Sequence, residues 1–125
     1  MECGVIQLGD GIGAAIALRL AEAGAGVVVH YHTAAERAEA VAAGIRERGG
    51  EAFTLGADLA EEGGIRGLLQ ELEERGALPD GVVNVAARQD VTAFAGIDAE
   101  EWRGLMATNL AGVFLITACE SLTHC

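Results

Sequence analysis

The sequence has 125 residues, enough for one domain with a hydrophobic core. Its formal net charge of −11 argues against nucleic acid or an anionic membrane surface as a partner. No apolar run is long enough to span a bilayer, and the first residues lack the basic start of a secretory signal, so we expect a cytoplasmic protein.

Short β-rich segments alternate with segments of helical periodicity, which is typical of βαβ units around a parallel sheet. We predict strands over residues 3–8, 26–31, 52–55 and 81–85. Because βαβ crossovers are almost always right-handed, the predicted strand order is 3-2-1-4. The fold class is therefore α/β, with a Rossmann-type open parallel sheet of about four strands and helices on both faces, formed by residues 1–125 as a single domain.

Two helices are predicted between the first three strands. In the first, apolar residues recur every four positions before Gly24 ends the helix: Ile12, Ile16 and Leu20. The second begins with a capping box, in which Thr33 and Glu36 each satisfy a free backbone N–H of the first turn. Four residues form its apolar face, and Gly49 ends it: Ala38, Val41, Ala42 and Ile45.

Two more helices follow the third and fourth strands. The apolar face of the third consists of Ile65, Leu68, Leu69 and Leu72. Three glycines each weaken this helix by about 1 kcal/mol relative to alanine: Gly63, Gly64 and Gly67. Asp98 and Glu101 are expected to cap the fourth helix, whose stripe contains one amide among apolar residues: Trp102, Leu105, Met106, Asn109, Leu110 and Val113.

The first predicted strand runs into the sequence GDGIGA at 9–14, which opens a helix and fits the dinucleotide fingerprint G-x-G-x-x-A. Gly9 permits the tight turn, and Gly11 lets the backbone approach a pyrophosphate. The helix N–H groups and the positive end of the helix dipole then face the phosphates. A glycine-rich turn that merely connects two elements is the alternative. The βαβ context favours a dinucleotide site at Gly9, Gly11, Ile12 and Gly13.

The end of the second strand bears on the choice of cofactor. A carboxylate about twenty positions after the glycines would bind the ribose 2′-hydroxyl of NAD, but the sequence there is His30-Tyr31-His32. This favours NADP slightly over NAD, with His32 as a weak phosphate partner next to Tyr31. Asp10 in the glycine turn would repel a 2′-phosphate, so the cofactor is either NADP or NAD. His30 and His32 without a third ligand make a poor metal site, and we predict no metal.

Three further motifs accompany the glycine turn. They are ADL at 57–59 after the third strand, VNVAA at 83–87 at the end of the fourth, and NLAGVF at 109–114 on the fourth helix. Together with the turn, these motifs resemble the short-chain dehydrogenase/reductase family, in particular its 3-oxoacyl-acyl-carrier-protein reductases. The resemblance covers essentially the whole chain, which matches the amino-terminal half of such an enzyme.

The resemblance implies a role for each motif. Asp58 and Leu59 are expected beside the adenine, although Asp58 could also cap the third helix together with Glu61. Three residues are expected beside the nicotinamide ribose: Asn84, Ala86 and Ala87. Asn109 corresponds in position to an asparagine that helps to hold the family's catalytic lysine through water. The alternative for Asn109 is a buried amide bonded to neighbouring backbone.

Two departures from the family pattern are expected to weaken binding. Ile6 and Gln7 stand where the family has Thr-Gly before its glycines, and Val85 and Ala87 replace an asparagine and a glycine. The methyl group of Ala87 would lie where the backbone should approach the nicotinamide ribose.

In the resembling family, hydride transfer also needs a serine and a tyrosine whose pKa is lowered by a lysine. This sequence has no lysine, and Ser121 and Tyr31 lie in the wrong places. We therefore expect the dinucleotide-binding half of an NAD(P)-dependent oxidoreductase that is inactive alone. A nucleotide-binding subunit that pairs with a chain supplying the other half, and an interaction domain that binds no cofactor, are the alternatives. The apolar fourth helix further predicts a homo-oligomer.

Overall fold

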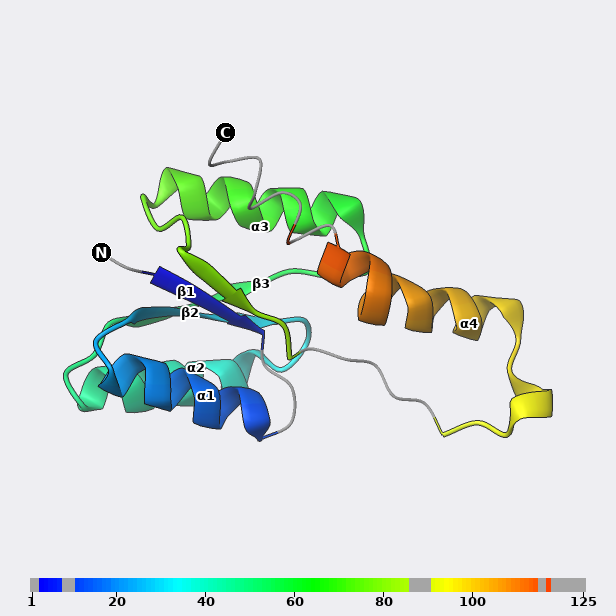
Figure 1. Ribbon diagram of the computed structural model, residues 1–125, viewed down its shortest axis with the longest axis horizontal. Helices are drawn as coiled ribbons and strands as arrows, with labels where there is room; N and C mark the ends of the chain where they lie inside the picture. The colour runs from blue at the N-terminus through cyan, green and yellow to red at the C-terminus, as the bar shows by residue number, and fades with distance from the viewer. Residues whose placement is uncertain (1–2, 8–10, 86–90, 115–116, 118–125) are drawn as a thin grey trace.

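The computed structural model describes residues 3–7, 11–85, 91–114 and 117 (Figure 1). Three of the predicted site residues lie outside these ranges: Gly9, Ala86 and Ala87. Leu8, Asp10 and Ser121 lie outside them as well. The expectations that concern these residues stay predictions.

Four parallel strands form one sheet in the order β3-β2-β1-β4, which matches the predicted order. The strands are β1 (Cys3–Gln7), β2 (Gly26–Tyr31), β3 (Ala52–Gly56) and β4 (Gly81–Val83). Val28 of β2 pairs with Val5 of β1, and Val5 pairs in turn with Val82 of β4. β3 extends one residue beyond its predicted end. β4 stops at Val83 rather than 85, because β1 pairs with it only over 81–83, so Asn84 follows the strand.

Helices cover both faces of the sheet (Figure 1). α1 (Ile12–Glu22) and α2 (Ala35–Glu47) lie on one face, and α3 (Glu62–Glu74) lies on the other. Alternate residues of β2 pack on opposite faces of the sheet. Val27 and Val29 pack on the face covered by α1 and α2, and Val28 packs against α3. Each of these valines is at most 1% exposed, and burying one contributes about 1.5–3 kcal/mol.

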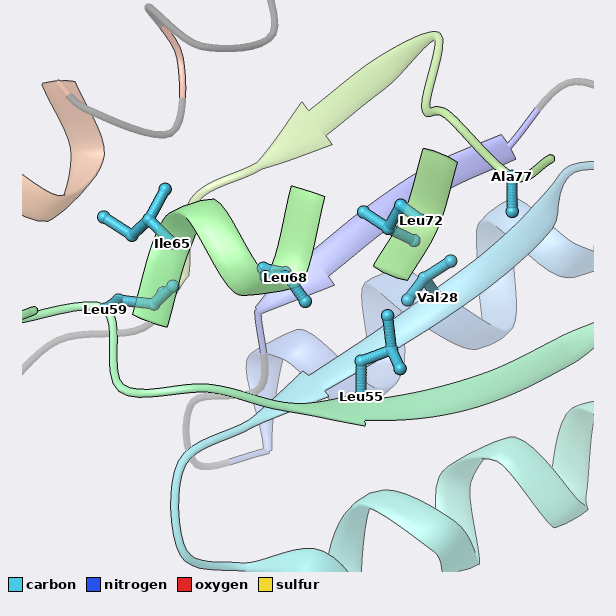
Figure 2. Packing of buried hydrophobic residues seen from close by; sticks show 7 residues of the cluster. All are labelled: Val28, Leu55, Leu59, Ile65, Leu68, Leu72 and Ala77. Carbon is cyan, nitrogen blue, oxygen red and sulfur yellow. The ribbon is translucent and has the colours of Figure 1, made fainter. Parts of the chain in front are cut away.

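The layer beneath α3 is the larger of the two apolar clusters by side-chain size. In Figure 2, Leu68 and Leu72 of α3 point toward Val28 and Leu55 of the sheet. Ile65 and Leu59 lie at the start of α3, and together with Ala77 they complete the cluster. The apolar face predicted for α3 is therefore the face that packs against the sheet.

The predicted caps have different outcomes. Asp98 caps α4 (Ala99–Met106) as expected, because its Oδ1 accepts a hydrogen bond of 2.8 Å from the backbone N–H of Glu101. The capping box at Thr33 and Glu36 is wrong. β2 continues to Tyr31 and the chain bends at 32–33, so α2 begins only at Ala35, with Ala34 at its N-cap and no side-chain hydrogen bond.

The chain after β4 reaches away from the sheet (Figure 1). It contains the short 3₁₀ helix η1 (Phe94–Gly96), then α4, then the π-helical turn η2 (Ala107–Ala111). The apolar stripe of this segment is exposed at four residues, by 57%, 36%, 61% and 68%: Trp102, Met106, Leu110 and Phe114. Among the described residues, no helix is long and apolar enough to cross a membrane.

Candidate functional site

All four strands end at the same edge of the sheet because they are parallel, and in such sheets this carboxyl edge is where ligands bind. Every predicted site residue that the structure describes belongs to a segment that ends or follows a strand at this edge or, for Asn109, to the segment that returns to it. These segments are the start of α1 after β1, the last residue of β2 (Tyr31) with His32 after it, residues 57–59 after β3 and Asn84 after β4.

The start of α1 presents an open helix N-terminus. Gly11 is its N-cap with a φ of 74°, a conformation that favours glycine, and none of the described side chains caps the helix. Within the described part of the chain, the first turn of α1 holds no acidic residue. The first N–H groups of α1 are therefore suited to an anion such as a phosphate.

Ile12 departs from the prediction for α1. The periodicity placed it in the buried stripe with Ile16 and Leu20, but Ile12 is 67% exposed. It is the first residue of α1, which begins at the carboxyl edge of the sheet. Gly13, the next residue, is buried, which fits close packing of the helix start.

The 57–59 turn, formed by Ala57, Asp58 and Leu59 after β3, is held by three elements that each approach one of its carbonyl groups. His30 of β2 binds the Ala57 carbonyl oxygen from Nε2 at 2.8 Å. A Cβ added to Gly64 of α3 would overlap the Asp58 carbonyl oxygen. A Cβ added to Gly112 would lie 2.6 Å from the Leu59 carbonyl oxygen. Only glycine permits the two close backbone approaches, so β2, the start of α3 and the segment at Gly112 together fix this turn.

Asp58 does not cap α3. The helix begins at Glu62, and its N-cap residue is Glu61. Asp58 comes too early in the chain to cap the helix as predicted. Instead, Asp58 Oδ1 accepts a hydrogen bond of 2.9 Å from the backbone N–H of Ala60, two residues on. The Asp58 side chain thus stabilises the turn itself and stays at the carboxyl edge.

Tyr31 ends β2 beside this turn, and His32 follows it. The backbone N–H of Ala57 donates to the Tyr31 carbonyl at 3.0 Å, and the Tyr31 ring lies against Gly56. His32 Nε2 lies 3.7 Å from Asp58 Oδ2, and both side chains are well exposed, so their ion pair when His32 is protonated is worth at most about 1 kcal/mol. The predicted phosphate partner is therefore close to the residue predicted to bind adenine.

His30 lies beside the 57–59 turn, and no sequence motif indicates this position. Its side chain is buried, and burial is the largest cause of a pKa below the usual value of 6.5. The hydrogen bond to Ala57 opposes this shift in the pKa of His30, and the nearby His32 adds to it. The alternation of side chains along a strand could have shown that His30 points inward where Val28 does. Over the described ranges, no three metal-binding side chains come together.

The two predicted asparagines are both exposed. Asn84 lies immediately after β4 at the carboxyl edge. Asn109 lies in the π-helical turn η2, so the alternative of a buried amide is wrong. Single π turns frequently occur at functional sites. Three residues after Asn109, Gly112 makes the close approach to Leu59 that brings this segment back to the 57–59 turn.

Comparison with known proteins gives a consistent result. The model of the family described as short chain dehydrogenase matches residues 5–121. The chain is 40% identical over 105 residues to the 3-oxoacyl-acyl-carrier-protein reductase FabG of Aggregatibacter actinomycetemcomitans, in an alignment that covers 83% of this chain and 43% of the reductase.

Solved structures resemble nearly all of this chain. A short chain dehydrogenase from Burkholderia cenocepacia in complex with NADP has a TM-score of 0.88 at 30% identity, covering 96% of this chain and 49% of that one. The landomycin C-6 ketoreductase LanV with bound NADP and rabelomycin has a TM-score of 0.85 at 35% identity, covering 95% and 51%. The chain spans about half the length of these proteins. It belongs to the short-chain dehydrogenase family and corresponds to the amino-terminal portion of its longer members.

Proposed function

We propose that this chain binds NADP or NAD at the carboxyl edge of its sheet, as the dinucleotide-binding half of an oxidoreductase. That enzyme would transfer hydride between the nicotinamide and a carbonyl or alcohol. The observation that carries the proposal is the open N-terminus of α1 after Gly11, at the same edge of the sheet as the fixed 57–59 turn. NADP in the solved structures of two relatives supports the same ligand.

The residues of the edge suit successive parts of such a dinucleotide. The pyrophosphate would bind at the start of α1, at Gly9, Gly11, Ile12 and Gly13. The adenosine would lie between the end of β2 and the 57–59 turn, against Tyr31, His32, Asp58 and Leu59. The nicotinamide ribose would lie after β4, at Asn84, Ala86 and Ala87. When bound, the nicotinamide supplies or accepts the hydride.

The proposed preference for NADP over NAD is small. His32 would attract a 2′-phosphate when it is charged. The carboxylate of Asp58 lies 3.7 Å from the His32 ring and offsets the charge of His32. We expect a discrimination of less than about tenfold, or about 1.4 kcal/mol.

The chemistry proposed for residues 1–125 is limited to binding and orienting the cofactor. A tyrosine with an unperturbed pKa near 10 is a poor proton donor at neutral pH, and the sequence has no lysine to lower that pKa. Asn109 matches the family pattern in position and would support catalysis only beside a serine, tyrosine and lysine.

The second candidate is a nucleotide-binding subunit that pairs with another chain or with a copy of itself. The exposed stripe of Trp102, Met106, Leu110 and Phe114 favours it, since contiguous exposed apolar side chains commonly mark interfaces. A chain that supplies the catalytic half would cover the same stripe.

The test of the proposed function compares two glycine variants at opposite ends of α1. Gly11 and Gly24 both have positive φ, of 74° and 99°, and a Cβ added at either would meet no atom within 4 Å. Valine is strained at both positions because φ is positive, but only Gly11→Val also obstructs the pyrophosphate.

Calorimetric titration with NADP and with NAD measures the effect. We expect the original chain and Gly24→Val to bind with similar affinity, and Gly11→Val to bind at least about tenfold more weakly. Equal affinity of the two variants would contradict the assigned pyrophosphate site. Absence of binding to the original chain would contradict the proposed function.

A further inference from the structure

His30 is a buried imidazole with one hydrogen-bonded nitrogen and one nitrogen without a partner. The side chain is 2% exposed, and its Nε2 lies 2.8 Å from the carbonyl oxygen of Ala57. A carbonyl oxygen only accepts, so Nε2 must carry the proton and donate it. In the part of the chain that the structure describes, buried Nδ1 has no hydrogen-bond partner.

Protonation would change this arrangement. The imidazolium carries a second N–H on Nδ1, and a buried charged donor without an acceptor is strongly disfavoured. Burial, more than any other cause, already lowers the pKa of His30, and the nearby His32 lowers it further.

The charged groups around His30 give little compensation. The ionisable residues described on the adjoining segments are Tyr31 at the end of β2, His32 directly after it, Asp58 of the 57–59 turn, and Glu61 and Glu62 at the start of α3. Asp58 already accepts from Ala60 and lies near His32, and Glu61 and Glu62 are exposed. β4 and residues 107–114, which return to the turn at Gly112, contain no ionisable side chain.

We propose that His30 is a positioning residue that makes dinucleotide binding depend on pH. Neutral His30 holds the 57–59 turn in the conformation that receives the adenine end of the dinucleotide. When His30 is protonated, its side chain turns outward or its hydrogen bond to the 57–59 turn breaks. Dinucleotide binding then weakens. This inference rests on the proposed function, because it concerns the same site.

The test compares His30→Gln with His32→Gln. In His30→Gln, the amide nitrogen of the introduced side chain can donate to Ala57 as Nε2 does, but it does not titrate. His32→Gln removes the exposed histidine two residues away, so its pH profile, not its absolute affinity, shows how much of the pH dependence comes from His32. NAD is the probe because it lacks the 2′-phosphate of NADP, whose charge would change over the same range, near a pKa of about 6.

Calorimetry from pH 7.5 to 5.0 gives the first readout. We expect the affinity of the original chain and of His32→Gln to fall by up to about tenfold per pH unit once His30 becomes protonated. His30→Gln should keep its affinity over this range. A pH-independent affinity of the original chain, or a decline that persists in His30→Gln, would overturn the proposal.

Hydrogen exchange of the Ala60 amide in the original chain without ligand gives the second readout. This amide donates to Asp58 Oδ1, so its protection reports whether the turn is intact. After correction for intrinsic exchange, protection should fall with His30 protonation, as followed by the imidazole nitrogen resonances.

If the turn opens but NAD never binds, the proposed function fails and the role of His30 in the turn stands. If NAD binds while the turn stays protected in acid, the role of His30 fails alone. This readout needs no variant that might misfold.

Discussion

His30 and His32 lie two residues apart at the end of β2, and their environments differ sharply. His30 is buried and hydrogen-bonded to the 57–59 turn, whereas His32 is exposed near Asp58. The sequence predicts His32 at the site because of its distance from the glycine turn, but it contains no motif that indicates His30. The contact of His30 with Ala57 spans 27 residues, so it depends on how β2 and β3 are placed in register.

The glycines of α3 give a prediction at the level of single residues. From the sequence, Gly63, Gly64 and Gly67 are expected to weaken the helix equally. In the structure, their surroundings differ. A Cβ at Gly67 would meet nothing within 4 Å, whereas a Cβ at Gly64 would overlap the Asp58 carbonyl. We expect Gly67→Ala to raise the free energy of unfolding by about 1 kcal/mol through helix propensity. Gly64→Ala should lower it by about 1–3 kcal/mol, because the 57–59 turn must shift.

Urea denaturation of the two variants, followed by circular dichroism, measures this difference. The dinucleotide affinity of Gly64→Ala should fall as well, while that of Gly67→Ala should not change. If both alanines stabilised the protein equally, the close contact between α3 and the turn would be wrong.

The secondary-structure elements were predictable where periodicity and burial agree. The valines of β2 and the leucines of α3 belong to the two apolar clusters, as their sequence pattern predicts. The right-handed crossovers between parallel strands then predict the strand order. Element boundaries depend on pairing and local bends, which the sequence does not display. The false capping box at Thr33 and the early end of β4 both have this cause.

The position of α4 and η2 was not predictable from the sequence. The amphipathic stripe indicated a helix but not which side chains would be covered, and Figure 1 shows the helix extending away from the sheet. The approach of Gly112 to Leu59 needs both the π turn and the end of β3, which are about 50 residues apart in the chain.

At the level of elements, we predict that the exposed stripe mediates self-association. Leu110 and Ala111 are both exposed on η2, but only Leu110 belongs to the apolar stripe. Leu110→Glu would place a charge in a helix-to-helix contact and should shift the protein toward monomer, whereas Ala111→Glu should have little effect. Light scattering over a concentration series under reducing conditions checks this. A mass that stays monomeric at every concentration for the original chain would contradict the prediction.

For the whole molecule, the sheet order and the two covering layers bring the glycine turn, the end of β2 and the 57–59 turn to one edge. The family resemblance predicts this arrangement, and the comparisons confirm the family. The net charge of −11 adds long-range repulsion against an anionic ligand, so the local donors at the start of α1 must overcome it.

The most direct measurement of the central claim is amide chemical-shift mapping of the labelled chain during titration with NADP. If the dinucleotide binds at the carboxyl edge, the amides of Gly11, Ile12, Asp58 and Leu59 should shift with increasing NADP. Those of Gly26 and Gly50, at the opposite edge of the sheet, should stay unchanged. Shifts confined to the opposite edge, or no shifts at saturating NADP, would contradict the account.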